Sequence, residues 1–443
     1  MKKLKIGVYF ANSGYYDIDL KSPEEGNPGI GGTQFNALTL VYYYQHYYPE
    51  NEIILFADKN ELLPDTIRIV ECNNLENAII KANDNSLDIF IYQPSGYTEF
   101  YKKKIFELIN KVENTKFIAW INNTPIEDIC DSIAIEENIV RLVCAGRAQQ
   151  DRLRDHPVFY KSQTIYNGFD AKPYNPKARI EKTKSVLFIG SLTKFKGFHI
   201  LAKIWKDIIQ EVPDAVLDVV GSGKLYNNDA KLGKFGLAEE TYENEFMQHL
   251  TDEDGNILKN VVFHGLLGTE KIELLQKATV CVPNPTAISE ICPASAIEPQ
   301  ACETAVVTKK KFGFLDTVWD KNSGFLVTNE QQLIEKIVYL LKNPDVAERM
   351  GKKGPEFIDK HFNQKIICQQ WHALFLDIEN DSEKTYKHNY RFLFLEDNAK
   401  REFMRLTKLL FPNTRALTPL RFRPKMPNWK GLIGLTTKQI LKK

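Results

Sequence analysis

Short apolar runs alternate with segments of helical periodicity along most of this chain, and this alternation limits the folds open to it. A first series ends near residue 167, and a second begins at residue 185. The runs are rich in Val, Ile, Leu and Phe, as buried strands are. They cover residues 4–10, 52–57, 87–92, 116–121, 139–145 and 162–167, and then 185–190, 215–221, 261–265, 279–284, 304–308 and 324–328. Strands separated by helices predict βαβ units and therefore parallel sheets.

The chain of 443 residues is too long for one compact core, which favours two domains with an appendage. Residues 171–184 are polar, contain two prolines and lack periodicity, which is typical of an interdomain linker. We therefore expect an N-terminal α/β domain at residues 1–170 and a C-terminal one at residues 185–361. A helix is expected at residues 362–380, and residues 381–443 form an extension.

The composition, with 43% hydrophobic and 26% charged residues, is that of a soluble globular protein. No run approaches the roughly 18 to 20 apolar residues of a membrane span. The opening run at residues 4–10 lacks the longer apolar region of a signal peptide. The seven cysteines are scattered, without a C-x-x-C pair. Buried reduced thiols in a cytoplasmic protein are therefore expected.

Charge is distributed unevenly although the net charge is +1. Residues 381–443 hold 15 basic and 5 acidic residues, a net +10, so the remainder carries 43 against 52, or −9. The extension mixes these basic residues with Phe, Leu and Trp, and each basic side chain near an anionic membrane is worth about 1 kcal/mol. We expect it to dock on the cytoplasmic membrane face; packing on the acidic body or at a subunit interface is the open alternative. Nucleic acid fits poorly, because the acidic body would repel it.

Two carboxylates, Glu290 and Glu298, stand eight positions apart, before a short apolar run at residues 304–307. Pro293 lies between them, where it can open a helix. Glu290 is therefore expected in the loop after one strand and Glu298 on the helix that follows. In an open α/β sheet such loops lie outside the carboxyl ends of the strands, where ligands bind. On spacing alone, two solvated acids on an ordinary helix would explain the pattern as well.

Residues 289–307, SEICPASAIEPQACETAVV, resemble the E-x7-E signature of retaining GT-B glycosyltransferases of family 4. The resemblance implies an α/β fold with two Rossmann-like domains, whose parallel sheets face a central cleft. It also implies that Glu298 binds the ribose hydroxyls of a nucleotide-diphosphate sugar, and that Glu290 binds the donor sugar as a catalytic residue. Pro299 and Glu303 depart from the family pattern: a proline inside a helix removes one hydrogen bond, and Glu303 replaces a glycine at the helix end.

A second candidate segment places Lys196 and Gly197 between an apolar run and a helix. Glycine at a helix entrance lets the backbone approach a ligand, and helix N-termini favour anions. The segment resembles the family's G-R-L-x-x-x-K-G motif, which implies that Lys196 acts in catalysis by stabilising the leaving diphosphate. Ser191 replaces the family arginine, and Lys194 is a candidate substitute for it. Without the resemblance, Lys196 would be a solvated surface lysine.

Two strand ends complete the expected donor site. Gly221 and Gly223 form a G-x-G, a pattern that is a turn about as often as a ligand loop. They resemble the family's loop near the diphosphate. His264 and Gly265 match the segment whose backbone holds the base. A purely structural histidine is the alternative at position 264.

In the N-terminal half, Gly31 and Gly32 follow a loop of roughly 20 residues, which is usually functional or disordered, and precede a helical stretch at residues 32–47. They resemble the family's G-G loop, which faces donor phosphate and acceptor; a plain helix start is the alternative. Many family members carry a histidine after the strand that matches residues 116–121, and Asn122 stands there instead. The absence of this histidine excludes an imidazole at that position. It does not exclude retaining transfer, in which the leaving phosphate itself takes the acceptor proton.

Two helices are expected after the last strand. Residues 329–343 are amphipathic, and Pro344 ends that pattern. In the resembled family, the helix matching residues 362–380 crosses back onto the N-terminal domain. The resemblance covers residues 4–380, so residues 381–443 have no counterpart in the family core.

The resemblance implies a retaining hexosyltransferase with an N-terminal acceptor domain and a C-terminal nucleotide-sugar domain. The acceptor would be a glycan or a lipid-linked glycan, as in surface polysaccharide or glycoconjugate synthesis, and neither a metal nor another cofactor is implied. Two alternatives stay open: a sugar-nucleotide 2-epimerase of the same fold, and a protein that binds sugar nucleotides without transfer. Ser191 and the missing histidine favour the latter. A nicotinamide dehydrogenase would need G-x-G-x-x-G after the first strand, which is absent.

Overall fold

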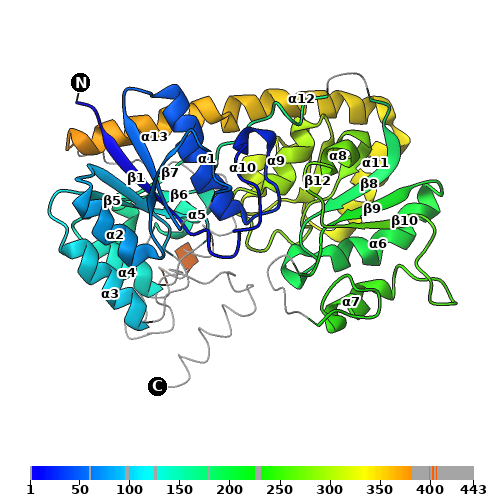
Figure 1. The fold of residues 1–443 in the computed structure, drawn as a ribbon. Coiled ribbons are helices and arrows are strands. Elements are labelled where there is room, and N and C mark those ends of the chain that lie inside the picture. Colours follow the sequence, from blue (N-terminus) through cyan, green and yellow to red (C-terminus); the bar gives the residue numbers. More distant parts are fainter. Residues whose placement is uncertain are drawn as a thin grey trace.

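Two parallel sheets, each with helices packed on both faces, form the two halves of the molecule (Figure 1). The computed structural model describes residues 2–58, 61–94, 99–123, 127–154, 156–176, 180–224 and 231–381, and residues 399, 402, 403 and 406. The first sheet has the strand order β3-β2-β1-β4-β5-β6-β7, and the second has β10-β9-β8-β11-β12-β13. Both orders reverse beside the first strand of the sheet, which is where open α/β sheets bind ligands.

The N-terminal sheet contains the six runs predicted in this half and one further strand, β3. The strands are β1 (Lys5–Phe10), β2 (Glu52–Ala57), β3 (Arg68–Glu71), β4 (Ile89–Tyr92), β5 (Lys116–Ile121), β6 (Ile139–Cys144) and β7 (Ser162–Thr164). Edge strand β3 is mostly exposed and begins and ends with a charged residue, so it lacks the apolar signal of a buried strand.

Helices cover both faces of this sheet. They are α1 (Gly32–Tyr47), α2 (Leu75–Asp84), α3 (Glu99–Asn110), α4 (Glu127–Ile135) and α5 (Arg147–Arg152), with 3-10 turns η1 (Pro23–Glu25) and η2 (Pro157–Lys161). Helix α1 begins at Gly32, as predicted. One core packs α1 against β1 and β4, whereas a second core packs α2, α3 and α4 on the opposite face.

The C-terminal sheet repeats this architecture. Its strands are β8 (Thr183–Ile189), β9 (Val216–Val220), β10 (Val261–Gly265), β11 (Ala278–Cys281), β12 (Ala305–Lys309) and β13 (Gly324–Val327). The helices are α6 (Phe198–Glu211), α7 (Glu240–Met247), α8 (Lys271–Lys277), α9 (Ala294–Ala301), α10 (Phe314–Thr317) and α11 (Glu330–Lys342), with the 3-10 turn η3 (Lys194–Lys196). The largest core joins α6, α7 and α11 to one face, and α8 packs on the other.

Two long helices run along one side of both halves (Figure 1). Pro344 ends the α11 pattern, as predicted, but it is also the first residue of α12 (Pro344–Phe362), a helix that the sequence analysis did not predict. Proline is favoured there because the first helical N–H needs no partner. The helix expected from residue 362 is α13 (Gln364–Glu379), which begins after Asn363, whose side chain accepts from the Lys365 amide.

Helix α13 belongs to the core of the N-terminal half although it follows the C-terminal sheet in sequence. Trp371 is fully buried and packs edge-to-face on Trp120 of β5, with ring centroids 5.1 Å apart. Extension residues 382–398, 400–401, 404–405 and 407–443 lie outside the described residues.

Lys182 is a half-buried cation just before β8. Its ammonium donates to the Thr304 hydroxyl at 2.6 Å. Burial lowers the pKa of Lys182 to about 8, from an ordinary value of 10.5, because desolvation disfavours the charged amine. Between these two pH values the unfolded chain holds the proton and the folded protein does not. Stability from this group therefore increases as pH rises through the interval.

We expect the unfolding free energy of the wild type, relative to Lys182→Met, to rise between pH 8 and 10.5. The rise should amount to about 1.4 kcal/mol for each unit by which the pKa is lowered. Urea denaturation of both proteins across this range measures it. A difference that stays flat with pH would show that the Lys182 amine titrates normally.

Candidate active site

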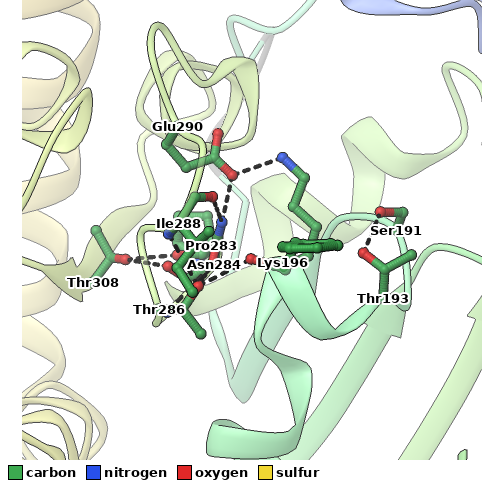
Figure 2. A network of polar contacts seen from close by, with 10 residues as sticks. Ser191, Thr193, Lys196, Pro283, Asn284, Thr286, Ile288, Glu290 and Thr308 are labelled. Atoms are coloured by element: carbon green, nitrogen blue, oxygen red, sulfur yellow. Dashed lines mark hydrogen bonds and ion pairs between the residues drawn. The ribbon is translucent and has the colours of Figure 1, made fainter. Parts of the chain in front are cut away.

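The loop between β11 and α9 carries Glu290 and is held by its own polar side chains (Figure 2). Asn284, Ala287 and Ser289 have φ angles of 31°, 59° and 62°. Such conformations are unfavourable for residues other than glycine and concentrate at functional sites. The Asn284 amide donates to Glu290 Oε1 at 2.6 Å and to the Ile288 carbonyl at 3.2 Å. These bonds hold the strained loop and orient the Glu290 carboxylate.

Lys196 and Glu290, the two predicted catalytic residues, meet in space. Lys196 Nζ lies 2.7 Å from Glu290 Oε1 although 94 positions separate the residues. The Glu290 side chain is 5% exposed and that of Lys196 is 26% exposed. The ammonium therefore compensates a nearly buried carboxylate while it still reaches solvent. An anionic group that enters here would compete with Glu290 for the same cation.

Gly197 joins η3 to α6 and packs against the Glu290 loop. Its φ of 71° lies in the left-handed region, and an added Cβ would come within 2.5 Å of Thr286 Cγ2. The Thr286 hydroxyl lies 3.0 Å from the carbonyl oxygen of Phe195. Glycine is therefore required by both conformation and contact. The loop before α6 and the loop before α9 thus form one unit.

Glu298 lies on α9, and the structure gives one of its oxygens two donors. Lys271 Nζ is 2.7 Å from Glu298 Oε1, and the Tyr174 hydroxyl is 3.1 Å from the same atom. The side chain is 7% exposed. Among the described residues Oε2 has no hydrogen-bond partner, so this oxygen is free to accept from a ligand.

The two departures from the family pattern around Glu298 are accommodated at the helix end. Pro299 lies inside α9, and the helix ends two residues later. The Cys302 amide bonds to the carbonyl of Glu298 at 3.1 Å, and the Thr304 amide to that of Pro299 at 2.9 Å. Glu303 has a φ of 56°, the left-handed conformation for which glycine is favoured at helix ends.

Close packing explains why the first position of the predicted diphosphate loop, Gly221, is a glycine. At Gly221 an added Cβ would lie 1.8 Å from the Gly190 carbonyl oxygen, so no larger residue fits. Gly223 lines a cavity of about 240 Å³ together with Lys194 and residues of α7. The strand-end glycines thus let the loops after β8 and β9 approach one another.

In the part of the chain that the structure describes, neither Ser191 nor Lys194 replaces the family arginine. The Ser191 side chain is buried, and its hydroxyl lies 3.4 Å from that of Thr193. Lys194, the candidate substitute, is 69% exposed and pairs with Glu245 of α7 at 2.8 Å. Among the described residues, the Lys196 side chain is the cation that lies against Glu290.

His264 has a structural partner. Its Nε2 lies 2.7 Å from Asp218 Oδ1, and the other Asp218 oxygen accepts from the Ser185 hydroxyl. The three hydrogen-bonded side chains come from the neighbouring strands β8, β9 and β10. The Gly265 carbonyl accepts from the Gly221 amide at 2.8 Å. The imidazole therefore has a structural partner, consistent with the alternative reading of this residue.

Several amide side chains lie near the start of α1, where the candidate residues Gly31 and Gly32 are found. Gly31 is the N-cap residue and Gly32 the first helical residue. Asn36 of α1 donates to Asn122 Oδ1 at 3.4 Å, and the buried Nδ2 of Asn122 has no partner in the part of the chain that is described. Gln93 donates to the Thr33 carbonyl at 3.2 Å. An unpaired buried amide is a donor available to a ligand.

An ion pair between a half-buried arginine and a buried aspartate joins the two halves beside the Glu290 loop. Arg147, at the start of α5, donates from its backbone amide to Asp316 Oδ2 at 2.9 Å and from Nε to Oδ1 at 2.6 Å. The Asp316 side chain is fully buried, and burial raises its pKa while Arg147 opposes the change. The preceding Gly146 packs so closely on the Ile291 carbonyl that an added Cβ would lie 2.6 Å from it.

Residues 171–357, from the linker through most of α12, match the family model described as glycosyl transferases group 1. The C-terminal half is a group 1 glycosyl transferase domain. Spore coat protein SA of Bacillus subtilis is 25% identical over 227 residues, covering 47% of this chain and 57% of that protein. The capsular polysaccharide biosynthesis glycosyltransferase CapM of Staphylococcus aureus is 24% identical over 198 residues, covering 44% and 47%. The chain therefore spans about half the length of these curated relatives.

The likeness to solved structures extends over both halves. The crystal structure of Anabaena HepE in complex with UDP matches with a TM-score of 0.61 at 15% identity, covering 84% of this chain and all of that chain. This likeness shows the fold. Together with the two parallel Rossmann-like sheets, it identifies the group 1 glycosyl transferase domain as one half of a GT-B fold.

Three residues that were not predicted from the sequence lie at or beside the predicted site of the group 1 glycosyl transferase domain: Asn284 bonds to Glu290, Tyr174 bonds to Glu298, and Arg147 bonds to Asp316 beside the Glu290 loop. Asn284 ends the run at residues 279–284, so a polar residue at a strand end was an available signal. Tyr174 lies in the predicted linker, and Arg147 lies in the other half of the chain. Neither carries a local signal, because its partner is distant in sequence.

Among the described residues, no group of three or more His, Cys, Asp or Glu side chains is arranged to hold a metal ion. No helix in that part of the chain has the length and apolar character needed to cross a membrane.

We expect Arg147→Met to lower the unfolding free energy by about 3 to 5 kcal/mol, because Asp316 would remain buried without its cation. The double variant Arg147→Met/Asp316→Leu should regain most of the loss, since no charge is then left in the contact. Urea denaturation at pH 7 measures both effects. Equal losses in the single and double variants would contradict the ion pair as the cause.

Proposed function

We propose that this protein is a retaining hexosyltransferase that moves a sugar from a nucleotide-diphosphate sugar to a glycan or lipid-linked acceptor. The observation that carries the proposal is the contact of Lys196 with Glu290 in a strained loop of a group 1 glycosyl transferase domain. A ligand that reached this contact would meet a cation and a carboxylate together. Such a ligand has an anionic part and a hydroxyl-bearing part, as a sugar diphosphate does.

The residues suggest a division of work. The ammonium of Lys196 would stabilise the negative charge that develops on the diphosphate as the bond to the sugar breaks. Glu290, released from Lys196, would accept hydrogen bonds from sugar hydroxyls, and Oε2 of Glu298 would accept from the nucleotide ribose. The acceptor hydroxyl forms the new glycosidic bond on the face that the diphosphate leaves, and its proton passes to the leaving phosphate oxygen.

Similar proteins guide the choice of substrates. HepE was solved with UDP, so UDP-sugars are the first donors to test. CapM is named for capsular polysaccharide biosynthesis, which favours a surface polysaccharide or another glycoconjugate as the product. Nδ2 of Asn122, which has no partner among the described residues, would donate to the acceptor in the N-terminal half.

Incubation with UDP-, GDP-, ADP- and dTDP-sugars and a panel of glycan and lipid-linked acceptors tests the proposal. Transfer should release the nucleoside diphosphate and form a glycoside with the anomeric configuration of the donor. An isomerised donor would identify a sugar-nucleotide 2-epimerase. Binding without turnover would identify a sugar-nucleotide-binding protein, the reading that Ser191 and Asn122 favour.

The two acids should have separable effects. Glu298→Ala should weaken nucleotide binding about tenfold or more, because a hydrogen bond to a charged group is lost. Glu290→Ala should mainly lower kcat, since its partners are the sugar and Lys196. Titration calorimetry and initial rates measure the two quantities, with Glu273→Ala as an exposed-acid control on α8. Wild-type values in both variants would refute the assignment of the site.

We further propose that residues 381–443 hold the enzyme at the cytoplasmic membrane face, near a lipid-linked acceptor. Their net charge of +10 and their interleaved aromatic residues support this role. Full-length protein should float with anionic liposomes at low salt, whereas a 1–380 truncation should stay in solution. Equal partitioning of both proteins would contradict membrane docking and favour an extension that packs on protein.

A further inference from the structure

Tyr174 connects three parts of the molecule although it lies in the segment between the sheets. Its side chain is almost fully buried. The ring packs on Phe169 with centroids 4.8 Å apart, and the backbone carbonyl accepts from Gln276 Nε2 on α8 at 3.0 Å. The linker is therefore anchored to the C-terminal domain at this residue.

The Tyr174 hydroxyl reaches the acid that the proposed function assigns to the nucleotide. It donates to Glu298 Oε1 at 3.1 Å, and Lys271 Nζ, from α8, lies 2.7 Å from the same oxygen. A carboxylate with two donors on one oxygen is restricted in rotation, and its second oxygen is directed to one place. Burial, and then Glu298, raise the pKa of Tyr174 well above its usual value. The hydroxyl therefore remains a donor at neutral pH.

The same hydroxyl lies beside a loop of the N-terminal half. Gly26, at the end of η1, lies so close that an added Cβ would be 3.2 Å from Tyr174 Oη. Gly26 belongs to the long loop between β1 and α1, which leads to Gly31 and Gly32. A single phenol oxygen therefore lies between Glu298 in one domain and a glycine loop in the other.

We propose that Tyr174 is a positioning residue for the donor site: its hydroxyl orients Glu298 and makes nucleotide binding depend on the position of the Gly26 loop. This role rests on the proposed function, because it takes Glu298 as the acid that binds the ribose. Lys271 supplies charge compensation for Glu298, whereas Tyr174 supplies the link to the linker and to the N-terminal half. Movement of the Gly26 loop would shift the phenol, and the phenol would turn the carboxylate.

Tyr174→Phe removes the hydroxyl and keeps the ring. We expect UDP binding to weaken about tenfold and kcat at saturating donor to change little. Tyr43→Phe is the matched control, because Tyr43 is also buried and its hydroxyl donates to a carboxylate, Asp170 Oδ2, at 2.6 Å. Both variants should lose similar thermal stability, and only Tyr174→Phe should lose UDP affinity.

The link between the domains is tested by Gly26→Ala against Gly14→Ala. Both glycines lie in the loop before α1 with positive φ, 110° and 96°, so both variants are strained. Only at Gly26 does the new methyl group meet another residue, Tyr174; at Gly14 it meets nothing within 4 Å. Gly26→Ala should therefore weaken UDP binding several-fold more than Gly14→Ala does.

Titration calorimetry with UDP, and with GDP, ADP and dTDP where UDP does not bind, separates the outcomes. A wild-type protein that binds none of these nucleotides overturns the proposed function and this role with it. Wild-type binding that is unchanged in Tyr174→Phe overturns the positioning role alone. Equal affinities in Gly26→Ala and Gly14→Ala overturn the link to the N-terminal loop.

Discussion

The contact between Arg147 and Asp316 is the constraint on which the geometry of the candidate site depends. Asp316 is fully buried, so its carboxylate needs the guanidinium that comes from the other half of the chain. On both sides of this pair the backbone at Glu290 and Ile291 is enclosed by glycines. Gly146 packs on the Ile291 carbonyl, and the Gly313 amide donates to the Glu290 carbonyl at 3.0 Å. The position of Glu290 is thus set by both domains.

The Glu290 loop has a strained backbone, and hydrogen bonds from its own side chains compensate for the strain. Three residues with positive φ would be costly in a loop that had no compensation. The Asn284 side chain supplies it, and Lys196 neutralises the carboxylate. Glu290 holds Lys196 in this structure, so under the proposed function an arriving diphosphate would replace one anionic partner of Lys196 by another. The site therefore holds its cation in place before a ligand arrives.

Local patterns in the sequence predicted much of this molecule. The alternation of runs predicted two parallel sheets, and the spacing of Glu290, Pro293 and Glu298 predicted a strand, a loop and a helix in that order. What the sequence did not show depends on partners far apart in the chain. Arg147 and Tyr174 have no periodicity or motif, and their partners lie 169 and 124 positions away. Likewise β3 and α12 were missed. The short, mostly exposed edge strand β3 has only two apolar residues between charged ones, and a helix that begins with proline resembles the end of the helix before it.

Within the described residues the chain passes between the two halves twice, and the two crossings lie side by side. One follows Phe169, and the other is the break between α12 and α13 at Asn363. The Phe169 amide donates to the Phe362 carbonyl at 2.7 Å, and Phe169 and Asn363 form an isolated β-bridge. The two connecting segments are therefore hydrogen-bonded to each other at one point, which makes this point a natural hinge between the domains. If the domains rotate about an axis through this bridge, distances between the halves change least near Phe169 and most at the rim farthest from it.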